Sequence, residues 1–293
     1  QRRGGRGRMG MRTRDEDFVD QLFIASTHSY ILIFTDRGRV YWLKVHEIPE
    51  VGPQGRGKAV ANLVHLQATE KIAAFVSVKD FSPGRYVLLA TRKGIVKKTE
   101  LAAFANPRTG GIIALGVEED DSLIEAVLTS GQDEIMLATR EGMSVRFAED
   151  DVRPMGRAAY GVKGIELEEA DEVVGMEVVR GEGTVLTVTA NGYGKRTEMA
   201  EYRVQSRGGK GLINIKSSPR NGAVVGVKCL EGDEHVMLIT EKGMIIRLNT
   251  ADISMIGRNT QGVRLIQLEE GDHLVSVARL AERDEEDAPG PEA

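Results

Sequence analysis

The first seven residues, QRRGGRG, combine arginine and glycine in a pattern that suits the binding of phosphate groups. An arginine side chain presents a planar fork of N–H donors that matches two phosphate oxygens. Glycine adopts positive φ without strain, so successive backbone N–H groups can converge on one anion. The heptad therefore predicts a phosphate-binding loop, and the alternative is a solvated basic arm. The residues assigned to this loop are Gln1, Arg2, Arg3, Gly4, Gly5, Arg6 and Gly7.

Weaker copies of this heptad recur along the chain. Residues 205–211 read QSRGGKG, which matches the heptad at five of seven positions and places Lys210 where the heptad has Arg6. Shorter basic loops that contain glycine begin at Pro53, Asn106, Met155 and Ile256. Recurrence at several places favours a binding function over a chance basic terminus.

Five stretches share a second pattern, in which two apolar runs flank a polar turn that ends in glycine. Runs rich in Val, Ile and Leu around a two-residue X-Gly turn predict β-hairpins with primed turns. The turn glycines follow one another at intervals of 48 to 56 residues, and they are Gly38, Gly94, Gly142, Gly192 and Gly243.

A basic loop and two further β-type runs follow each hairpin. Four strands per unit of about fifty residues predict the blades of a β-propeller, because each blade then buries its faces on its neighbours. Complete blades are expected at about 28–80, 84–131, 132–181, 182–231 and 232–281. By the same spacing, residues 1–27 form the rear of a further blade whose leading hairpin precedes residue 1. We therefore expect the chain to be a fragment of a longer polypeptide.

Basic residues also recur at fixed distances from the turn glycines. In the last four repeats an arginine lies 14 or 15 positions after the glycine, and in four of the five repeats a Lys or Arg lies four positions after it. This register predicts a ring of positive charge around the edge of a disc, and the alternative is that these strand residues merely face water. The predicted rim residues are Arg56, Lys58, Lys97, Lys98, Arg108, Arg146, Arg157, Lys195, Arg196, Arg207, Lys210, Arg247, Arg258 and Arg264.

The charge of the chain is segregated, although its net value is only −5. Residues 1–14 hold six arginines and no acid, whereas residues 282–293 hold six acids and one arginine. The last twelve residues are therefore expected to form a flexible acidic tail. The single cysteine, Cys229, excludes an internal disulfide framework and lies in an apolar run, so we expect it to be a buried small hydrophobe. We find no secretory signal and no apolar run of roughly 18 residues, so we expect a cytoplasmic protein with no membrane partner.

Catalytic and metal-binding motifs are not evident. Gly52, Gly57 and Lys58 fit the spacing of a P-loop, but Ala59 stands where the magnesium-binding Ser or Thr is needed. The five histidines are scattered and none has the spacing of a zinc site. We therefore expect no catalytic residue, no metal and no cofactor in this chain.

The heptad QRRGGRG resembles the signature box of the C-terminal DNA-wrapping domain of bacterial DNA gyrase A. The likeness extends over roughly residues 1–281 and includes ATREG at 138–142, NGYGKRT at 191–197 and IGRNTQGV at 256–263. The resemblance implies an all-β, six-bladed β-pinwheel, a propeller variant with four-stranded blades that exchange strands with their neighbours. In this chain the first blade lacks its leading strands, which leaves closure of the ring open.

The resemblance also implies a function. The positively charged rim of such a domain wraps double-stranded DNA with positive handedness and presents it to the rest of gyrase A and to gyrase B. The parent enzyme is a type IIA topoisomerase that uses ATP and magnesium elsewhere, and the domain itself is expected to be monomeric. The acidic tail either modulates wrapping or is a plain solubilising terminus. Two alternatives stay open: the corresponding domain of topoisomerase IV, whose box is usually eroded, and a protein-binding propeller scaffold.

Overall fold

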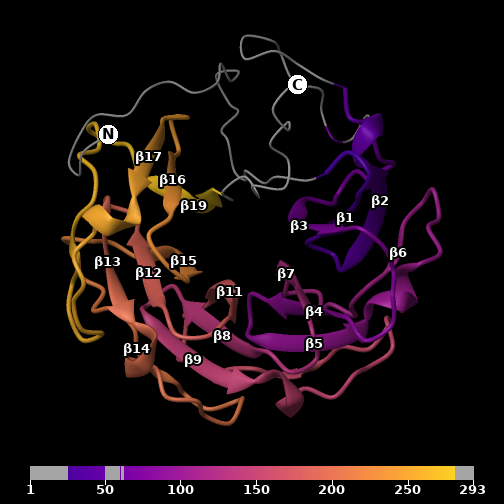
Figure 1. Cartoon of the computed structure of the whole chain (residues 1–293), viewed down its shortest axis with the longest axis horizontal. Helices are drawn as coiled ribbons and strands as arrows, with labels where there is room; N and C mark the ends of the chain where they lie inside the picture. The colour runs from indigo at the N-terminus through magenta and orange to yellow at the C-terminus, as the bar shows by residue number, and fades with distance from the viewer. Residues whose placement is uncertain (1–25, 50–59, 61–62, 281–293) are drawn as a thin grey trace, which may run out of the picture.

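Five antiparallel β-sheets follow one another around an arc, like the blades of a propeller (Figure 1). The structure is a computed structural model that describes residues 26–49, 60 and 63–280. Four of the sheets in this part of the chain have four strands and the fifth has three. The prediction of an all-β propeller with four-stranded antiparallel blades is confirmed. The number of blades in the complete ring concerns residues 1–25 as well, and these lie outside the described part.

Each sheet is built around one of the predicted hairpins. The hairpin strands are β1 (Tyr30–Thr35) and β2 (Arg39–Lys44), β4 (Tyr86–Thr91) and β5 (Ile95–Glu100), β8 (Glu134–Thr139) and β9 (Met143–Ala148), β12 (Thr184–Thr189) and β13 (Tyr193–Glu198), and β16 (His235–Thr240) and β17 (Ile245–Asn249). Short 3-10 helices follow the second strands, namely η1 (Val45–Glu47), η3 (Leu101–Phe104), η4 (Glu149–Asp151), η5 (Met199–Glu201) and η6 (Thr250–Asp252).

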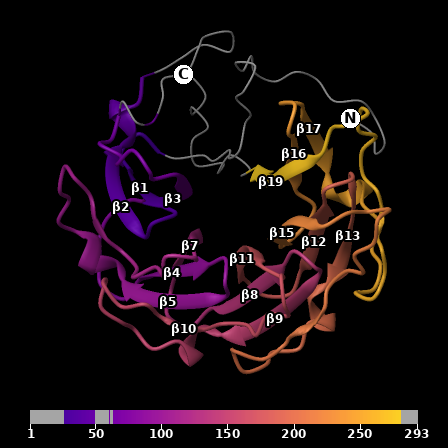
Figure 2. The same cartoon turned by 180° about the vertical axis from the view of Figure 1, so that it is seen from behind.

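A third strand pairs with the first hairpin strand and lies toward the centre of the arc (Figures 1 and 2). These inner strands are β3 (Ile72–Val78), β7 (Leu123–Thr129), β11 (Val173–Val179), β15 (Val224–Leu230) and β19 (Leu274–Leu280). All five are seven residues long and break register near the end of their hairpin partner, for example between Phe34 and Thr35 where β1 pairs with β3.

The fourth strand of a sheet comes from the following repeat. Two-residue strands β6 (Ile112–Ile113), β10 (Val162–Lys163), β14 (Leu212–Ile213) and β18 (Val263–Arg264) pair with β2, β5, β9 and β13 respectively. Each exchanged strand therefore forms the outer edge of the preceding blade. Among the described residues, β17 has no such outer partner. The exchange ties successive repeats together by main-chain hydrogen bonds, so a blade is not one continuous range of the sequence.

The hairpin turns differ from the two-residue primed turns that the sequence predicted. Three residues separate β1 from β2, and the N–H of Gly38 donates to the Thr35 carbonyl at 2.9 Å, with Gly38 at φ 73°. The loop therefore has three residues and ends in a left-handed glycine, unlike a two-residue primed turn. The Thr35 hydroxyl also accepts from the N–H of Arg39, which explains why threonine recurs before these turns.

The turn glycine has a second role, because it receives the exchanged segment. The carbonyl of Gly142 accepts the N–H groups of Asn214 and Ile215 at 2.8 and 3.1 Å. A Cβ atom on Gly142 would lie 2.2 Å from the Ile215 carbonyl oxygen. Glycine is therefore required both for the positive φ of the turn and for the close approach of the next repeat.

The apolar core lies within and between adjacent sheets. One cluster joins Leu32 and Phe34 of the first sheet to Val87 and Leu89 of the second, and Phe34 meets Phe104 edge-on with ring centroids 6.0 Å apart. Similar clusters join the second sheet to the third and the fourth to the fifth. The stacking of blades through their apolar faces thus accounts for the high Val, Ile and Leu content.

Candidate nucleic-acid interface

The exchanged strands set the outermost surface of the described blades. In β6, Ile112 is 9% exposed and faces the core, whereas the next residue, Ile113, is 47% exposed. Alternation along a strand explains this difference, because successive side chains point to opposite faces. The second residue is exposed in all four exchanged strands, and these residues are Ile113, Lys163, Ile213 and Arg264.

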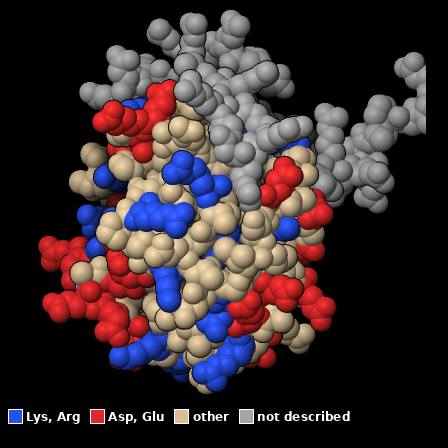
Figure 3. All heavy atoms as spheres, turned by 90° about the vertical axis from the view of Figure 1, so that its left-hand side faces the viewer, with Lys and Arg blue, Asp and Glu red and all other residues tan. Residues whose placement is uncertain are grey.

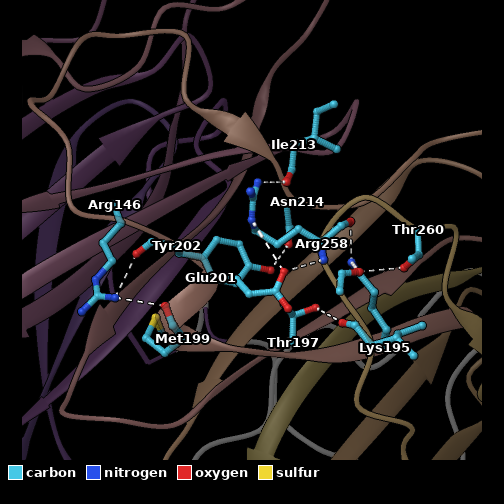
Figure 4. Close-up of polar contacts among 12 residues, drawn as sticks. Arg146, Lys195, Thr197, Met199, Glu201, Tyr202, Ile213, Asn214, Arg258 and Thr260 are labelled. Atoms are coloured by element: carbon cyan, nitrogen blue, oxygen red, sulfur yellow. Dashed lines mark hydrogen bonds and ion pairs between the residues drawn. The ribbon is translucent and has the colours of Figure 1, made fainter.

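At three of these four positions an arginine donates a hydrogen bond to the main-chain carbonyl. Each arginine comes from the loop that precedes the next exchanged strand. Arg157 donates to the carbonyl of Ile113 at 3.3 Å, Arg207 to that of Lys163 at 3.0 Å, and Arg258 to that of Ile213 at 2.7 Å. Figure 4 shows the last of these bonds. These half-buried arginines occupy the predicted position 15 residues after a turn glycine. They are structural clamps at the rim as well as positive charges.

The degenerate copy of the heptad at 205–211 shows how such a loop uses its donors. Arg207 donates from Nε to the Asp151 carbonyl at 2.7 Å and from Nη1 to the Lys163 carbonyl. The N–H of Gly208 donates to the Gly164 carbonyl at 2.6 Å. Groups that we expected to face a phosphate are therefore engaged with the preceding repeat. A guanidinium has five N–H donors, so Arg207 retains others for a ligand.

Three of the predicted rim lysines are buried, and for them the prediction of a solvent-facing charge is wrong. Lys97 and Lys195 have 0% exposure and Lys98 has 3%. The Lys97 ammonium donates to the carbonyls of Ala114 at 2.5 Å and Gly156 at 3.0 Å, and also to that of Arg157. Burial lowers the pKa of Lys97 to about 7, and the nearby Arg157 adds to this effect. The periodicity of the sequence identified lysines at equivalent positions of the repeats. In the structure, however, their side chains point inward from the rim.

Lys195 repeats this arrangement two repeats later. Its ammonium donates to the carbonyls of Gly257 at 2.7 Å and Arg258 at 2.5 Å (Figure 4). Burial lowers its pKa to about 8, and Arg258 contributes in the same direction while Glu201 opposes it. Both buried lysines therefore fix the loop that carries a clamp arginine.

Other cations of the same register are paired with acids. Lys98 lies 3.7 Å from the buried Glu149. Arg146 donates from Nε to Glu134 at 2.6 Å and from Nη1 to the carbonyls of Met199 and Tyr202, two bonds that Figure 4 shows.

Arg196 is half-buried and lies 3.3 Å from Asp233. Its Nε also donates to the carbonyl of Ile253 at 3.3 Å, which belongs to the next repeat. Lys98, Arg146 and Arg196 thus each contact the next repeat, and Arg146 also forms an ion pair within its own hairpin.

Four predicted rim residues are exposed in the described part, and they are Arg108, Lys210, Arg247 and Arg264. Lys210 pairs with Glu168 at 2.9 Å, an exposed contact that salt weakens. Arg264 donates to the Tyr193 hydroxyl at 3.0 Å and lies over the same ring. Arg220 also lies over the Tyr193 ring, 5.0 Å from its centroid. Arg220 was not among the predicted residues, because no other repeat has a basic residue at the matching position.

A hollow of about 620 Å³ opens at the rim between the first two described blades. Its lining includes three arginines, Arg39, Arg108 and Arg157, and the exposed Ile113. Small residues of the loops that precede β6 and β10 complete it. Arg39 donates to the carbonyl of Gly111 at 3.2 Å. Arg39 was not among the predicted residues, although its place directly after a turn glycine was visible in the sequence.

Charge is distributed unevenly over the outer edge. Figure 3 shows the disc from its side, with Lys and Arg running down the middle of the edge and Asp and Glu gathered toward the two flat faces. The acidic turns Glu118–Asp121 and Glu166–Glu172 lie beside hairpin turns, since Asp121 accepts from the N–H of Lys93 and Asp171 from that of Glu141, both at 3.0 Å. On the side of the edge that Figure 3 shows, a positive track therefore lies between negative borders.

Several predicted residues lie outside the described part of the chain. These are the heptad Gln1–Gly7, Arg56 and Lys58, and the acidic residues 282–293. Their assignments stay predictions.

A family model described as the DNA gyrase C-terminal domain, beta-propeller, matches residues 1–26, 29–79, 85–130, 133–180, 183–231 and 234–281. The chain belongs to this family. The six matched segments correspond to six repeats, of which the first is the shortest.

Curated relatives agree with this assignment. The chain is 48% identical over 282 residues to DNA gyrase A of Klebsiella oxytoca, with 96% of this chain and 32% of the relative covered. It is 48% identical over 288 residues to the Escherichia coli protein of the same name, covering 98% and 33%. The Staphylococcus aureus protein is 46% identical over 290 residues, covering 98% and 33%. The chain thus spans about a third of the length of these relatives.

Solved structures resemble the fold closely. The structure of a DNA gyrase A C-terminal domain matches with a TM-score of 0.85 and 26% identity, covering 96% of this chain and 92% of that one. The C-terminal domain of a DNA topoisomerase IV matches with a TM-score of 0.78 and 28% identity, covering 87% and 80%. The structures alone fit both enzymes, whereas the curated relatives cited above are gyrase proteins.

Three further features of the described residues concern the cysteine, metal binding and membrane spans. Cys229 is buried, as predicted, and burial raises the pKa of its thiol. Within the described ranges, no group of three or more His, Cys, Asp or Glu side chains is placed to hold a metal ion. No helix in the same ranges is long and apolar enough to span a bilayer.

Proposed function

We propose that this chain is the six-bladed DNA-wrapping domain of a bacterial DNA gyrase A, which bends double-stranded DNA around its basic rim. The observation that carries the proposal is the positive track on the side of the edge that Figure 3 shows, bordered by acids on both sides, in a member of the gyrase C-terminal family. In the proposal, residues 1–27 complete the sixth blade and residues 282–293 form a tail beyond it.

Bending is opposed by the stiffness of the duplex. A bend of 40–90° over 20–30 base pairs costs about 1–6 kcal/mol, and a long wrap repeats this cost. Phosphate contacts offset it, because each neutralised phosphate releases counterions regardless of sequence. The exposed Lys210, Arg247 and Arg264 and the partly exposed clamp arginines lie in successive repeats, so a duplex contacts them in turn only if it curves.

The heptad is the densest basic loop of the chain and belongs to the first repeat. We propose that it secures one end of the wrapped segment. The domain has no catalytic role of its own in this proposal and acts with the rest of gyrase A and with gyrase B in the bacterial cytoplasm. ATP and magnesium are used in those other parts of the enzyme.

Binding to duplexes of graded length at several salt concentrations tests the proposal. A wrapping domain gains affinity with length up to the wrap, and its affinity falls steeply with salt, by about 0.9 in log–log slope per contacted phosphate. A protein-binding scaffold would bind weakly and without dependence on length, and that result would reject the proposal.

A further inference from the structure

The four exposed positions of the exchanged strands alternate between apolar and basic residues. They read Ile113, Lys163, Ile213 and Arg264 from the first described blade to the fourth. These strands are the outermost of their sheets, so a duplex that follows the edge meets these side chains directly. Phosphate attraction explains the lysine and the arginine but does not explain the two isoleucines.

Both isoleucines are well exposed, at 47% for Ile113 and 41% for Ile213. Single exposed apolar residues are ordinary on protein surfaces. Here, however, the large exposed hydrophobics of the described residues share one location, since they lie in the exchanged strands or in the loops that precede them. They are Ile113, Tyr160, Val204, Ile213 and Met255. Their confinement to the edge indicates a contact surface.

Each isoleucine stands beside a guanidinium. The carbonyl of Ile113 accepts from Arg157, and that of Ile213 from Arg258 at 2.7 Å. Ile113 also stands in the wall of the 620 Å³ hollow, which Arg39 and Arg108 line as well. An apolar side chain flanked by cations suits a deoxyribose or an opened base step next to a phosphate.

We propose that Ile113 and Ile213 are wedges that enter the minor groove of the wrapped duplex and concentrate its bending at alternate blades. This inference rests on the proposed wrapping function. Apolar wedges between base steps partly unstack them and kink the duplex, at a cost that the additional protein contacts offset. The neighbouring guanidinium holds the phosphate beside the kink, while Lys163 and Arg264 hold the straighter segments between kinks. The occupant is double-stranded DNA, because cations surround the apolar residues.

The test compares the 293-residue chain with two double variants at the same register. One is Ile113→Ala with Ile213→Ala, and its matched control is Lys163→Ala with Arg264→Ala. Three quantities are measured on one duplex of mixed sequence: the salt dependence of affinity, energy transfer between labelled ends, and permanganate oxidation of unstacked thymines. A third variant, Ile113→Leu with Ile213→Leu, keeps the apolar volume.

The two double variants are expected to fail in different ways. The isoleucine variant keeps its salt slope but loses the thymine oxidation and the approach of the ends, with affinity reduced about tenfold. The basic variant loses about 1.8 in salt slope and retains the oxidation. The leucine variant behaves like the parent. The isoleucine side chains are exposed, so unchanged melting curves are expected for the isoleucine and leucine variants. A melting curve of the basic variant checks that loss of the bond from Arg264 to Tyr193 leaves the fold intact.

Two results would overturn the inference while leaving the wrapping function intact. One is a wrapped duplex without enhanced thymine oxidation, and the other is an isoleucine variant that bends DNA as the parent does. If the isoleucine variant changed only the oligomeric state, the surface would be a protein contact and the inference would be wrong. A parent chain that did not bind duplex DNA at all would instead reject the proposed function.

Discussion

The Arg258 guanidinium donates to the carbonyl of Ile213, 2.7 Å away and one repeat earlier in the sequence. The same relation joins Arg207 to Lys163. An arginine of the basic loop thus fixes the strand that forms the outer edge of the preceding blade. Contact surface and stability depend on the same side chains.

Substituting a clamp arginine should loosen the exchanged strand that it holds. We expect Arg258→Ala to lower the free energy of unfolding by about 1–2 kcal/mol, because it removes a charged hydrogen bond to a main-chain carbonyl. Faster amide exchange in β14 would locate the effect. Arg247→Ala is the matched control, since Arg247 is exposed and should change stability by less than about 0.5 kcal/mol. Equal losses in the free energy of unfolding for the two variants would contradict the role of Arg258 in holding β14.

The buried Lys97 should make stability depend on pH. Its pKa falls from 10.5 to about 7 in the folded chain, so between these values the unfolded chain binds a proton that the folded chain does not. Stability therefore rises with pH through this window, by at most about 1.4 kcal/mol per pH unit, and the contribution is absent below pH 7.

Urea unfolding between about pH 6.5 and 10 measures this slope. Lys97→Met should lower this slope without abolishing it, because the pKa of the buried Lys195 is about 8 and this lysine contributes in the same direction. Lys79→Met, at an exposed position, should leave the slope unchanged. The same slope in the parent and in Lys97→Met would show that Lys97 stays charged in the fold.

Exposed and buried cations should differ in their effect on DNA binding. Replacing Lys210, Arg247 or Arg264 with Ala should each lower the log–log salt slope by about 0.9, because one phosphate contact is lost. Lys97→Met and Lys195→Met should leave the slope within about 0.3, since their ammonium groups bind carbonyls inside the rim. Fluorescence anisotropy at several salt concentrations gives these slopes. An equal drop for the buried lysines would mean that the rim opens when DNA binds.

The heptad should control the wrap more than the affinity. Replacing Arg2, Arg3 and Arg6 with Ala should reduce affinity modestly but abolish the topological change that wrapping causes in a closed circle of DNA. The triple substitution of Arg8, Arg12 and Arg14 removes the same charge from the same end of the chain. If both triple variants lost the wrap alike, net charge would be sufficient and the heptad would have no specific role.

The turn glycines should differ from other left-handed glycines in their tolerance of a side chain. Gly142→Ala adds a Cβ atom 2.2 Å from the Ile215 carbonyl oxygen, whereas Gly84→Ala adds one with no atom within 4 Å. Both positions have positive φ, at 91° and 82°. We expect a loss of about 1 kcal/mol for Gly84→Ala from backbone strain alone. For Gly142→Ala we expect about 3 kcal/mol or more, because the exchanged segment must also move. Thermal unfolding compares the two.

The repeat and its hairpins were predictable because they depend on local pattern. Alternating apolar runs, a glycine that takes positive φ and a threonine that bonds across the turn are all encoded within about twelve residues, as in 31–42. The turn type was not correctly predicted, because one additional residue in the loop changes its class without changing the X-Gly signal.

Tertiary structure decided which basic residues face a ligand. Lys98 and Arg247 both lie four positions after their turn glycines, yet Lys98 is buried and Arg247 is exposed. The difference arises because the segment that covers Lys98 comes from the next repeat, where the Glu149 carbonyl accepts from its ammonium, and a contact across 51 positions leaves no periodic trace near either residue. The sequence alone determined the repeat, the charge segregation and the family. Only the packing of each repeat on the previous one determined which charges became clamps and which remained at the surface.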